Sequence, residues 1–333
     1  MLYWKAGGRI FISAALNDSG NYYIRSSWEE DADLLHFHCG TMGAGHGHSD
    51  KLHVDLILAG EDVLTDSGRY TYVVDRGRFE FKNPDAHNTV IVDGEFFTQC
   101  KDAWECSKLT QPVKQLFKEK DGYAFIQGGN LGYMHKGVFV NRKIVSLGDG
   151  LYVIADELYG AGDHEMEQYW NFSERGRAAY ENGRAVFTGE RVKAELLFVS
   201  PGCQAALGEG KISRHYNRYE TRARLGVKRA GKGFQSMITV IGGGKKGGGT
   251  QDTGISDSRK VSSEGHHLPG IHGRSGKGGN GKAGICGDPL PPGGKFTHRS
   301  YGSRRLYGIW KCDCFLIKGK AVQAERCFAI DKV

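Results

Sequence analysis

The chain has 333 residues, of which 39% are hydrophobic and 25% are charged, and this length allows one or two domains. No stretch approaches the roughly 18 apolar residues that a membrane-spanning helix requires, so we expect no membrane span. Residues 242–333 carry 16 Lys and Arg against 7 Asp and Glu, whereas residues 1–241 have a net charge of −2. The main part of the chain lacks the basic excess of a nucleic-acid-binding domain, and we expect no nucleic-acid partner.

Residues 1–13 are too short to form a domain, and we interpret them as the remnant of a linker. They include Lys5 and Arg9 and lack the long apolar core and cleavage site of a signal peptide. Either the protein is cytoplasmic or the chain has lost its natural start.

Residues 14–241 contain repeated short segments that are rich in β-branched and aromatic residues and often alternate apolar with polar side chains. Asp93-Gly94 and Asn182-Gly183 are good hairpin signals, and no long segment shows the period of an amphipathic helix. We therefore predict an all-β fold, a large antiparallel β-sandwich (supersandwich) of a dozen or more strands. Strands are expected at 22–26, 35–39, 52–58, 89–92, 138–145, 152–156 and 194–199.

Three polar segments border these strands. His46 and His48 lie two residues apart at what we interpret as the entry to the strand at 52–58, so they should share one face. Asp66 ends the next strand, and His87 precedes a third. Two imidazoles and one carboxylate are a common zinc-binding set, which would leave His46 free for chemistry beside the metal. The alternative is that these histidines are ordinary members of glycine-rich loops.

Residues 242–333 have a different composition, with 21 glycines and few apolar residues before Phe296. Such a segment cannot bury enough surface to offset its ordering entropy, so we predict a disordered, Gly/Lys/Arg-rich, low-complexity basic tail. It is either a flexible tail that touches polyanions or the product of a reading-frame shift near residue 242, and we favour the frame shift.

The eight cysteines show no convincing framework, and Cys39, Cys100, Cys106 and Cys203 are interpreted as scattered, small buried residues. Trp170 is interpreted as a core aromatic, with stacking on a sugar ring as the alternative.

Three segments in combination resemble the C-terminal domain of heparinase II/III-like polysaccharide lyases. They are Gly45–Leu52, Leu64–Tyr72 and Ala86–Gly94, and the segments Ser19–Trp28 and Tyr169–Phe172 also fit that family. The resemblance covers about residues 14–241.

The resemblance implies an antiparallel β-sandwich that holds zinc and is paired with an N-terminal α/α toroid, with the active cleft between them. His48, Asp66 and His87 match the family's zinc ligands, and His46 matches a histidine that lines the cleft. The zinc would fix the loops that present His46 rather than activate water, because a lyase consumes no water. The toroid is missing from this sequence, so we expect a lyase fragment or one half of a split enzyme.

The reaction implied by the resemblance is β-elimination at a uronic acid. The site must neutralise the carboxylate, accept the C5 proton and protonate the leaving oxygen O4. His46 is the candidate base or carboxylate neutraliser, and Tyr70 and Tyr72 are candidate catalytic or cleft residues that strand alternation places on one face. Their alternative role is as half-buried aromatics in a sheet.

Arginines supply the candidate substrate contacts, because a guanidinium pairs with a carboxylate through two hydrogen bonds. Arg69 is either such a contact or part of a surface ion pair, and Arg76 and Arg78 either bind a polyanionic sugar or belong to a solvated turn. Asn88 is expected to orient His87 or cap its loop, and Asp50 to hold the ring of a nearby histidine.

These interpretations favour a lyase fragment acting on uronate-containing glycans such as heparan sulfate-like glycosaminoglycans or alginate. The alternatives are a non-catalytic carbohydrate-binding sandwich and a metal-stabilised structural domain. The resemblance implies a bacterial periplasmic, cell-envelope or secreted location, and some relatives that handle oligosaccharides are cytoplasmic.

Overall fold

The computed structural model describes residues 5–6, 9–10, 13–43, 46–101, 104–120, 122–246, 314–317 and 320–323. The chain divides into two units, residues 1–253 and 254–333. In the second unit the structure describes one antiparallel pair, β22 (Cys314–Ile317) with β23 (Lys320–Gln323). The expected disorder or frame shift of the tail therefore falls mostly outside the described residues.

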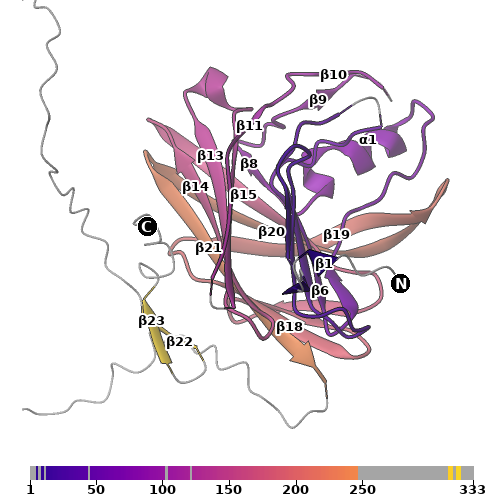
Figure 1. The fold of residues 1–333 in the computed structure, drawn as a ribbon. Coiled ribbons are helices and arrows are strands. Elements are labelled where there is room, and N and C mark those ends of the chain that lie inside the picture. Colours follow the sequence, from indigo (N-terminus) through magenta and orange to yellow (C-terminus); the bar gives the residue numbers. More distant parts are fainter. Residues whose placement is uncertain are drawn as a thin grey trace, which may run out of the picture. The chain divides into compact units, whose positions relative to one another are not determined.

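The first unit is built on a large antiparallel sheet of eight strands (Figure 1). In order from one edge of the sheet to the other, the strands are β11 (Pro112–Lys120), β12 (Tyr123–Asn130), β13 (Phe139–Ser146), β14 (Leu151–Tyr159), β21 (Gln235–Lys245), β18 (Val192–Phe198), β17 (Arg184–Thr188) and β16 (Arg177–Glu181).

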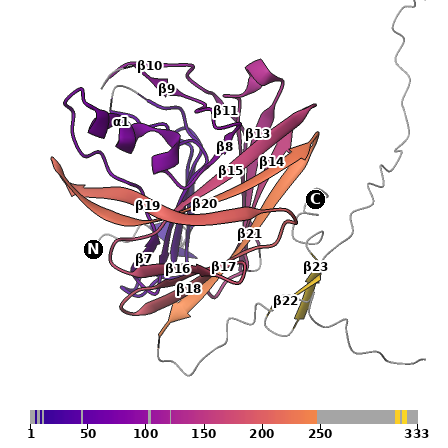
Figure 2. The ribbon, with the colours of Figure 1, turned by 180° about the vertical axis from the view of Figure 1, so that it is seen from behind.

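Two smaller antiparallel sheets complete the sandwich, and Figure 2 shows the long strands of one of them from behind. The first comprises β3 (Ala14–Leu16), β4 (Asn21–Arg25), β5 (Leu34–His38), β6 (His53–Leu58) and β7 (Glu61–Leu64). The second comprises β19 (Gln204–His215), β20 (Arg218–Lys232), β15 (Asp163–Asn171) and β8 (Val90–Val92). Two isolated pairs are β1 (Lys5–Ala6) with β2 (Arg9–Ile10), and β9 (Gln99–Cys100) with β10 (Cys106–Ser107).

The core is one cluster of buried apolar side chains from all three sheets, including Phe37 of β5, Ile144 of β13 and Trp170 of β15. Alternation along β4 and β5 buries every second residue and leaves those between only partly covered. The predicted antiparallel β-sandwich is confirmed, and the complete burial of Trp170 confirms its interpretation as a core residue.

The two predicted hairpin signals both form tight turns. Asn182 and Gly183 have φ of 51° and 78° and join β16 to β17, as the left-handed turn of a two-residue hairpin requires. Asp93 and Gly94 also have positive φ, but they close only a single bridge after β8. β8 itself pairs with β15.

The turn considered for Arg76 and Arg78 is instead the start of helix α1 (Arg76–Lys82). Asp75 caps it by accepting a hydrogen bond from the Arg78 backbone N–H at 2.8 Å. Seven residues including Gly77 are too few to give a periodic signal. The other short helices are η1 (Pro84–Ala86) and η2 (Met134–Lys136), and no helix among the described residues is long and apolar enough to cross a membrane.

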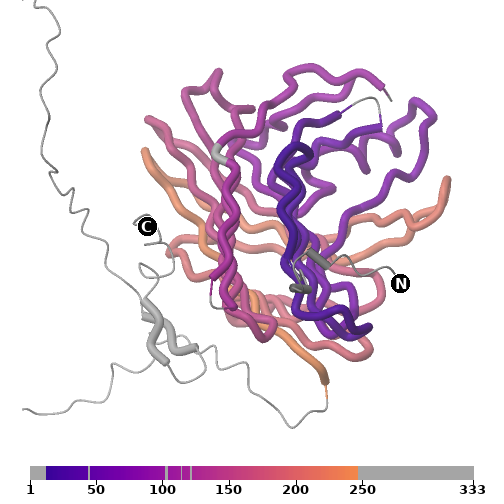
Figure 3. The backbone as a smooth tube through the Cα atoms, in the orientation of Figure 1, coloured from indigo at the N-terminus to yellow at the C-terminus, as the bar shows by residue number. Residues whose placement is uncertain are grey.

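The sandwich extends slightly beyond the predicted boundary at residue 241. Strand β21 remains paired with β18 as far as Lys245 and forms the orange end of the sandwich trace in Figure 3. A Cβ at Gly243 would lie 2.7 Å from Leu58 Cδ1 and 2.9 Å from Ala194 Cβ, so this position has room only for glycine. The first glycines of the glycine-rich segment therefore belong to the last strand of the sandwich, where Gly243 packs closely against Leu58 and Ala194.

A buried ion pair lies in the large sheet. Arg142 of β13 and Asp156 of β14 are inaccessible to solvent and make two hydrogen bonds of 2.7 Å. The same guanidinium donates to the carbonyls of Leu52 and Asn88, each at 2.6 Å. The pair thus connects the large sheet to two segments outside it.

Replacing Asp156 by Ala should lower the free energy of unfolding by about 3–5 kcal/mol, because it leaves the Arg142 charge buried without its counter-ion. The measurement is urea unfolding at pH 7. Arg184→Ala is the control, since it breaks a half-exposed pair with Glu195 and should cost about 0–1 kcal/mol. Equal losses in the two variants would contradict the distinction.

Candidate functional site

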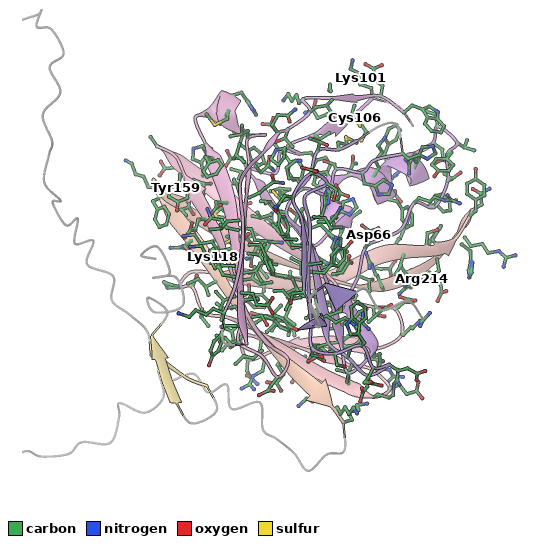
Figure 4. The ribbon with its side chains drawn as sticks, in the orientation of Figure 1. Asp66, Lys101, Cys106, Lys118, Tyr159 and Arg214 are labelled. Atoms are coloured by element: carbon green, nitrogen blue, oxygen red, sulfur yellow. The ribbon has the colours of Figure 1, made fainter. Side chains whose placement is uncertain are left out.

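Three candidate ligands converge from separate parts of the chain. His48 precedes β6, Asp66 follows β7 and His87 follows η1, and one ligand atom from each lies within 4.8 Å of the others. His87 Nδ1 is 2.8 Å from Asp66 Oδ2, and the His48 and His87 rings are 5.5 Å apart. The structure therefore brings together the three residues that the sequence selected, and Figure 4 labels Asp66.

A second carboxylate, Asp55 of β6, holds the backbone of the Asp66 segment. Its Oδ1 accepts the Asp66 backbone N–H at 2.8 Å and lies 3.0 Å from His53 Nε2. The Asp66 carboxylate in turn accepts the Gly68 N–H at 2.6 Å, which fixes the turn after β7. Sequence reasoning missed Asp55 and His53, whose only signal was their place on the strand after His48.

Asn88 secures the third ligand segment from a fully buried position. Its side chain donates to the Val54 carbonyl at 2.7 Å and accepts the Asn171 N–H at 2.6 Å, while its own N–H donates to His53 Nδ1 at 2.9 Å. These bonds reach β6 and β15 instead of capping a local turn. Asn88 therefore fixes the backbone next to His87.

The electrostatics of the three residues suit a bound cation. Burial lowers the pKa of His48 to about 4, so its ring is neutral at pH 7. Burial alone would raise the pKa of Asp66, but the charge and hydrogen bond of His87 outweigh it and hold that pKa well below its ordinary value. His87 Nε2 is buried without a hydrogen-bond partner. The His48 ring, the unpartnered His87 Nε2 and the Asp66 carboxylate are a donor set that fits a divalent metal such as zinc.

An exposed cluster contains the predicted cleft residues His46, Tyr72 and Arg69. His46 Nδ1 lies 2.9 Å from Tyr72 Oη, and Arg69 Nη1 donates to the same oxygen at 3.1 Å. Trp104 stacks on the Tyr72 ring at 5.4 Å. The guanidinium donates to the Tyr72 oxygen, and the tautomer of His46 sets which partner donates between His46 Nδ1 and Tyr72 Oη.

The interpretation of Arg78 as part of a solvated turn is wrong, because it is a residue of α1 and is inaccessible to solvent. Its Nη1 lies 3.2 Å from His48 Nε2 and donates to the Arg69 carbonyl at 3.2 Å, and its guanidinium carbon is 5.3 Å from the Tyr72 ring. Arg78 thus connects the buried and exposed clusters and is shielded from solvent. Arg76 is 92% exposed and pairs with Glu80 at 2.8 Å, so its contact with substrate stays a prediction.

The placement of Tyr70 and Tyr72 on one face of a strand is also wrong, because residues 65–72 are not a strand. Tyr70 has a φ of 58° and stacks on Phe81 at 5.2 Å. A Cβ on Gly77 would lie 2.5 Å from its ring, so Tyr70 is packed against α1. Of the two tyrosines, Tyr72 is the one that contacts His46.

The entry to a strand predicted at His46 and His48 is irregular chain, since β6 begins at His53. The rings of His46 and His48 have different neighbours, Tyr72 for the first and His87 for the second. Asp50 does contact a histidine, but this is His38 at 3.6 Å and not one of the candidate ligands.

Two exposed aromatic residues near Tyr72 were missed by sequence reasoning. Trp104 is 50% exposed and Tyr216 is 47% exposed, and the Arg69 guanidinium lies 5.5 Å from the Tyr216 ring. Both lie outside strands, and a large exposed aromatic in a connecting segment often marks a binding site. The sequence alone could have given this signal.

The fold and site define a large antiparallel β-sandwich domain with a His/Asp/His cluster beside an exposed His–Tyr–Arg cluster. A family model described as heparinase II/III-like, C-terminal, matches residues 12–249, and the chain belongs to this family.

Among curated proteins, the heparin-sulfate lyase of Pedobacter heparinus is 23% identical over 244 residues, which are 69% of this chain and 35% of that protein. The chain thus spans about a third of the length of this relative. The crystal structure of heparan sulfate lyase HepC from Pedobacter heparinus has a TM-score of 0.64 at 17% identity, covering 73% of this chain and 38% of that one. The heparinase III BT4657 gene product has a TM-score of 0.63 at 21% identity, covering 72% and 38%. These similarities establish a shared fold.

Asn88→Ala should lower the free energy of unfolding by about 1–3 kcal/mol, because the buried Asn171 N–H and Val54 carbonyl lose a partner. Urea unfolding measures the change. The control is Gln204→Ala at an exposed strand position, with an expected change within about 0.5 kcal/mol. An unchanged unfolding midpoint for Asn88→Ala would show that these bonds do not hold the ligand segment.

Proposed function

We propose that this chain is the β-sandwich part of a polysaccharide lyase that cleaves uronate-containing glycans by β-elimination. The observation that carries the proposal is that His46 and Arg69 both contact the phenolic oxygen of Tyr72 at the surface. Membership of the heparinase II/III-like family and the lyase activity named for its curated relative support it.

Tyr72 and His46 form a pair suited to proton transfer. The Arg69 N–H stabilises negative charge on Tyr72 Oη, and His46 Nδ1 can take the hydroxyl proton. The phenolate then removes the C5 proton of the uronate, and the electrons of that bond form the C4=C5 double bond as the C4–O4 bond breaks. The protonated His46 returns a proton to the leaving O4, so the reaction neither consumes water nor leaves a net charge.

The surroundings of Tyr72 suit a polyanionic sugar. Arg69 is exposed and can pair with the uronate carboxylate, which makes the C5 proton more acidic. Trp104 and Tyr216 offer exposed aromatic faces for the sugar rings, and the exposed Arg76 adds positive charge nearby. Heparan sulfate-like glycans are the substrate class that the curated relative favours, with alginate as the other uronate polymer.

We propose that zinc is the metal of the His48–Asp66–His87 cluster. Its support is the donor set, the proximity of the three ligand atoms and the unpartnered His87 Nε2. When bound, the ion cross-links the segments that carry His46 and Asn88. His48 lies two residues from His46, so its ligation would fix the position of the catalytic ring.

The rest of the active site would come from a second domain. The matched relatives are nearly three times as long as the part that this chain covers, and we propose that an α/α toroid supplies the opposite wall of the cleft. A polymer substrate of this kind also favours the bacterial periplasm, cell envelope or exterior as the place of action.

Purified protein should contain about one zinc per chain, and removal of zinc by a chelator should lower its melting temperature, because a structural metal contributes folding free energy. His48→Ala should abolish binding, as measured by elemental analysis. His135→Ala is the control, because His135 pairs with Glu95 outside the cluster. A folded protein without metal, before and after zinc addition, would contradict the proposal.

Tyr72→Phe should lower the turnover of the complete enzyme by about 10²–10⁴-fold, because it removes the proton-transferring oxygen. The measurement is the ultraviolet absorbance of the 4,5-unsaturated product from heparan sulfate, and Tyr70→Phe is the control that should retain activity. Full activity in Tyr72→Phe would contradict the assigned role. Saturable binding with no unsaturated product from heparan sulfate or alginate would indicate a carbohydrate-binding sandwich instead.

A further inference from the structure

Cys100 and Cys106 lie opposite each other in the β9–β10 hairpin. From the sequence they were interpreted as scattered, unrelated residues. Cys100 and Cys106 are direct partners in the antiparallel register, and their sulfur atoms are 3.1 Å apart. Both side chains are half-buried. Figures 1 and 2 place this hairpin at the same end of the sandwich as α1, and Figure 4 labels Cys106 there.

The register favours a covalent bond. The backbone N–H of Lys101 donates to the Glu105 carbonyl at 2.9 Å, so the next pair outward, Cys100 with Cys106, is a non-hydrogen-bonded pair. The Cα atoms of such a pair are about 4.5 Å apart, which lies inside the range of about 4.4–6.8 Å found across disulfides. The sulfur atoms need to approach by only about 1 Å to reach the bond length of about 2.05 Å.

The hairpin also positions an aromatic ring of the exposed cluster. Trp104 lies between the two cysteines in the sequence, and its ring is 5.4 Å from Tyr72 and 5.5 Å from His46. With the cysteines reduced, this end of the hairpin is closed by the Lys101–Glu105 backbone bond and ion pair, and that ion pair is exposed. A covalent link next to the turn would restrict how far Trp104 can move from Tyr72.

We propose that Cys100 and Cys106 form a reversible disulfide that closes the β9–β10 hairpin and holds Trp104 against Tyr72 and His46. The oxidant is a low-molecular-weight disulfide such as oxidised glutathione. One protein thiolate attacks this disulfide and releases one glutathione thiol, and the other thiolate then displaces the second. Two protein thiols are oxidised to one disulfide as one glutathione disulfide is reduced to two thiols. The proposal does not depend on lyase activity.

The local electrostatics set the conditions for the reaction. Burial and the neighbouring Cys106 thiol raise the pKa of Cys100 to about 12, although Lys82 and Arg78 act in the opposite direction. Because the thiolate is the nucleophile, exchange at neutral pH is slow, and the equilibrium must be approached over hours or at higher pH.

The test equilibrates the full chain in glutathione buffers of increasing oxidation, followed by acid quenching, thiol counting and non-reducing peptide mapping. The expected result is the loss of two of the eight thiols with a peptide linking Cys100 to Cys106. Cys100→Ser and Cys106→Ser should each abolish this peptide, and Cys203→Ser should leave it unchanged. Both thiols remaining free in the most oxidising buffer, or pairing with other cysteines, would overturn the proposal.

A second readout follows Trp104. The fluorescence difference between the wild type and Trp104→Phe isolates this ring, and its quenching by acrylamide should be weaker in the oxidised than in the reduced protein. Cys100→Ser should show the reduced level of quenching under both conditions. If the disulfide forms but quenching is identical in the two states, the proposal that it keeps Trp104 against Tyr72 and His46 is overturned.

Discussion

The guanidinium of Arg142, which has no access to solvent, is the point on which the site depends. Asp156 neutralises it inside the large sheet, and its remaining nitrogen donates to the carbonyls of Leu52 and Asn88. Asn88 then bonds to β6 and β15, next to His87. A buried charge is costly unless it is paired and hydrogen-bonded. Moving the segment of Leu52 or of Asn88 would remove a hydrogen bond from the Arg142 guanidinium, so both segments are held in place. The buried ion pair thus helps to set the position of the chain segment that carries His87.

The site has two parts that differ in their surroundings. In the ligand cluster His87 is fully buried and the Asp66 side chain is 39% exposed, whereas His46 and Tyr72 lie at an accessible edge lined by aromatic rings. Arg78 lies between them and contacts both. The hydrogen-bonded ligand cluster can hold its geometry while the neighbouring cluster of His46 and Tyr72 stays open to solvent.

The strand pattern and hairpin turns were predictable because they rest on local rules. Alternation of burial follows from the pleat, and Asn182-Gly183 adopts the left-handed turn that few other residue pairs tolerate. The ligand set was also foreseeable, because the order of strands brought the ends of β7 and η1 toward His48. By contrast, α1 was missed because seven residues carry too little periodicity, and Tyr70 was misplaced because its positive φ breaks the assumed alternation.

The sequence by itself determined the all-β architecture, the three candidate ligands and the resemblance to the heparinase II/III-like family, because these depend on short segments and their order. Only the tertiary structure decided which side chains meet across long separations. It buried Arg78 beside His48, separated Tyr70 from Tyr72 and set Cys100 opposite Cys106. Register, backbone dihedrals and burial arise from packing of the whole chain, and they determine the direction in which each side chain points.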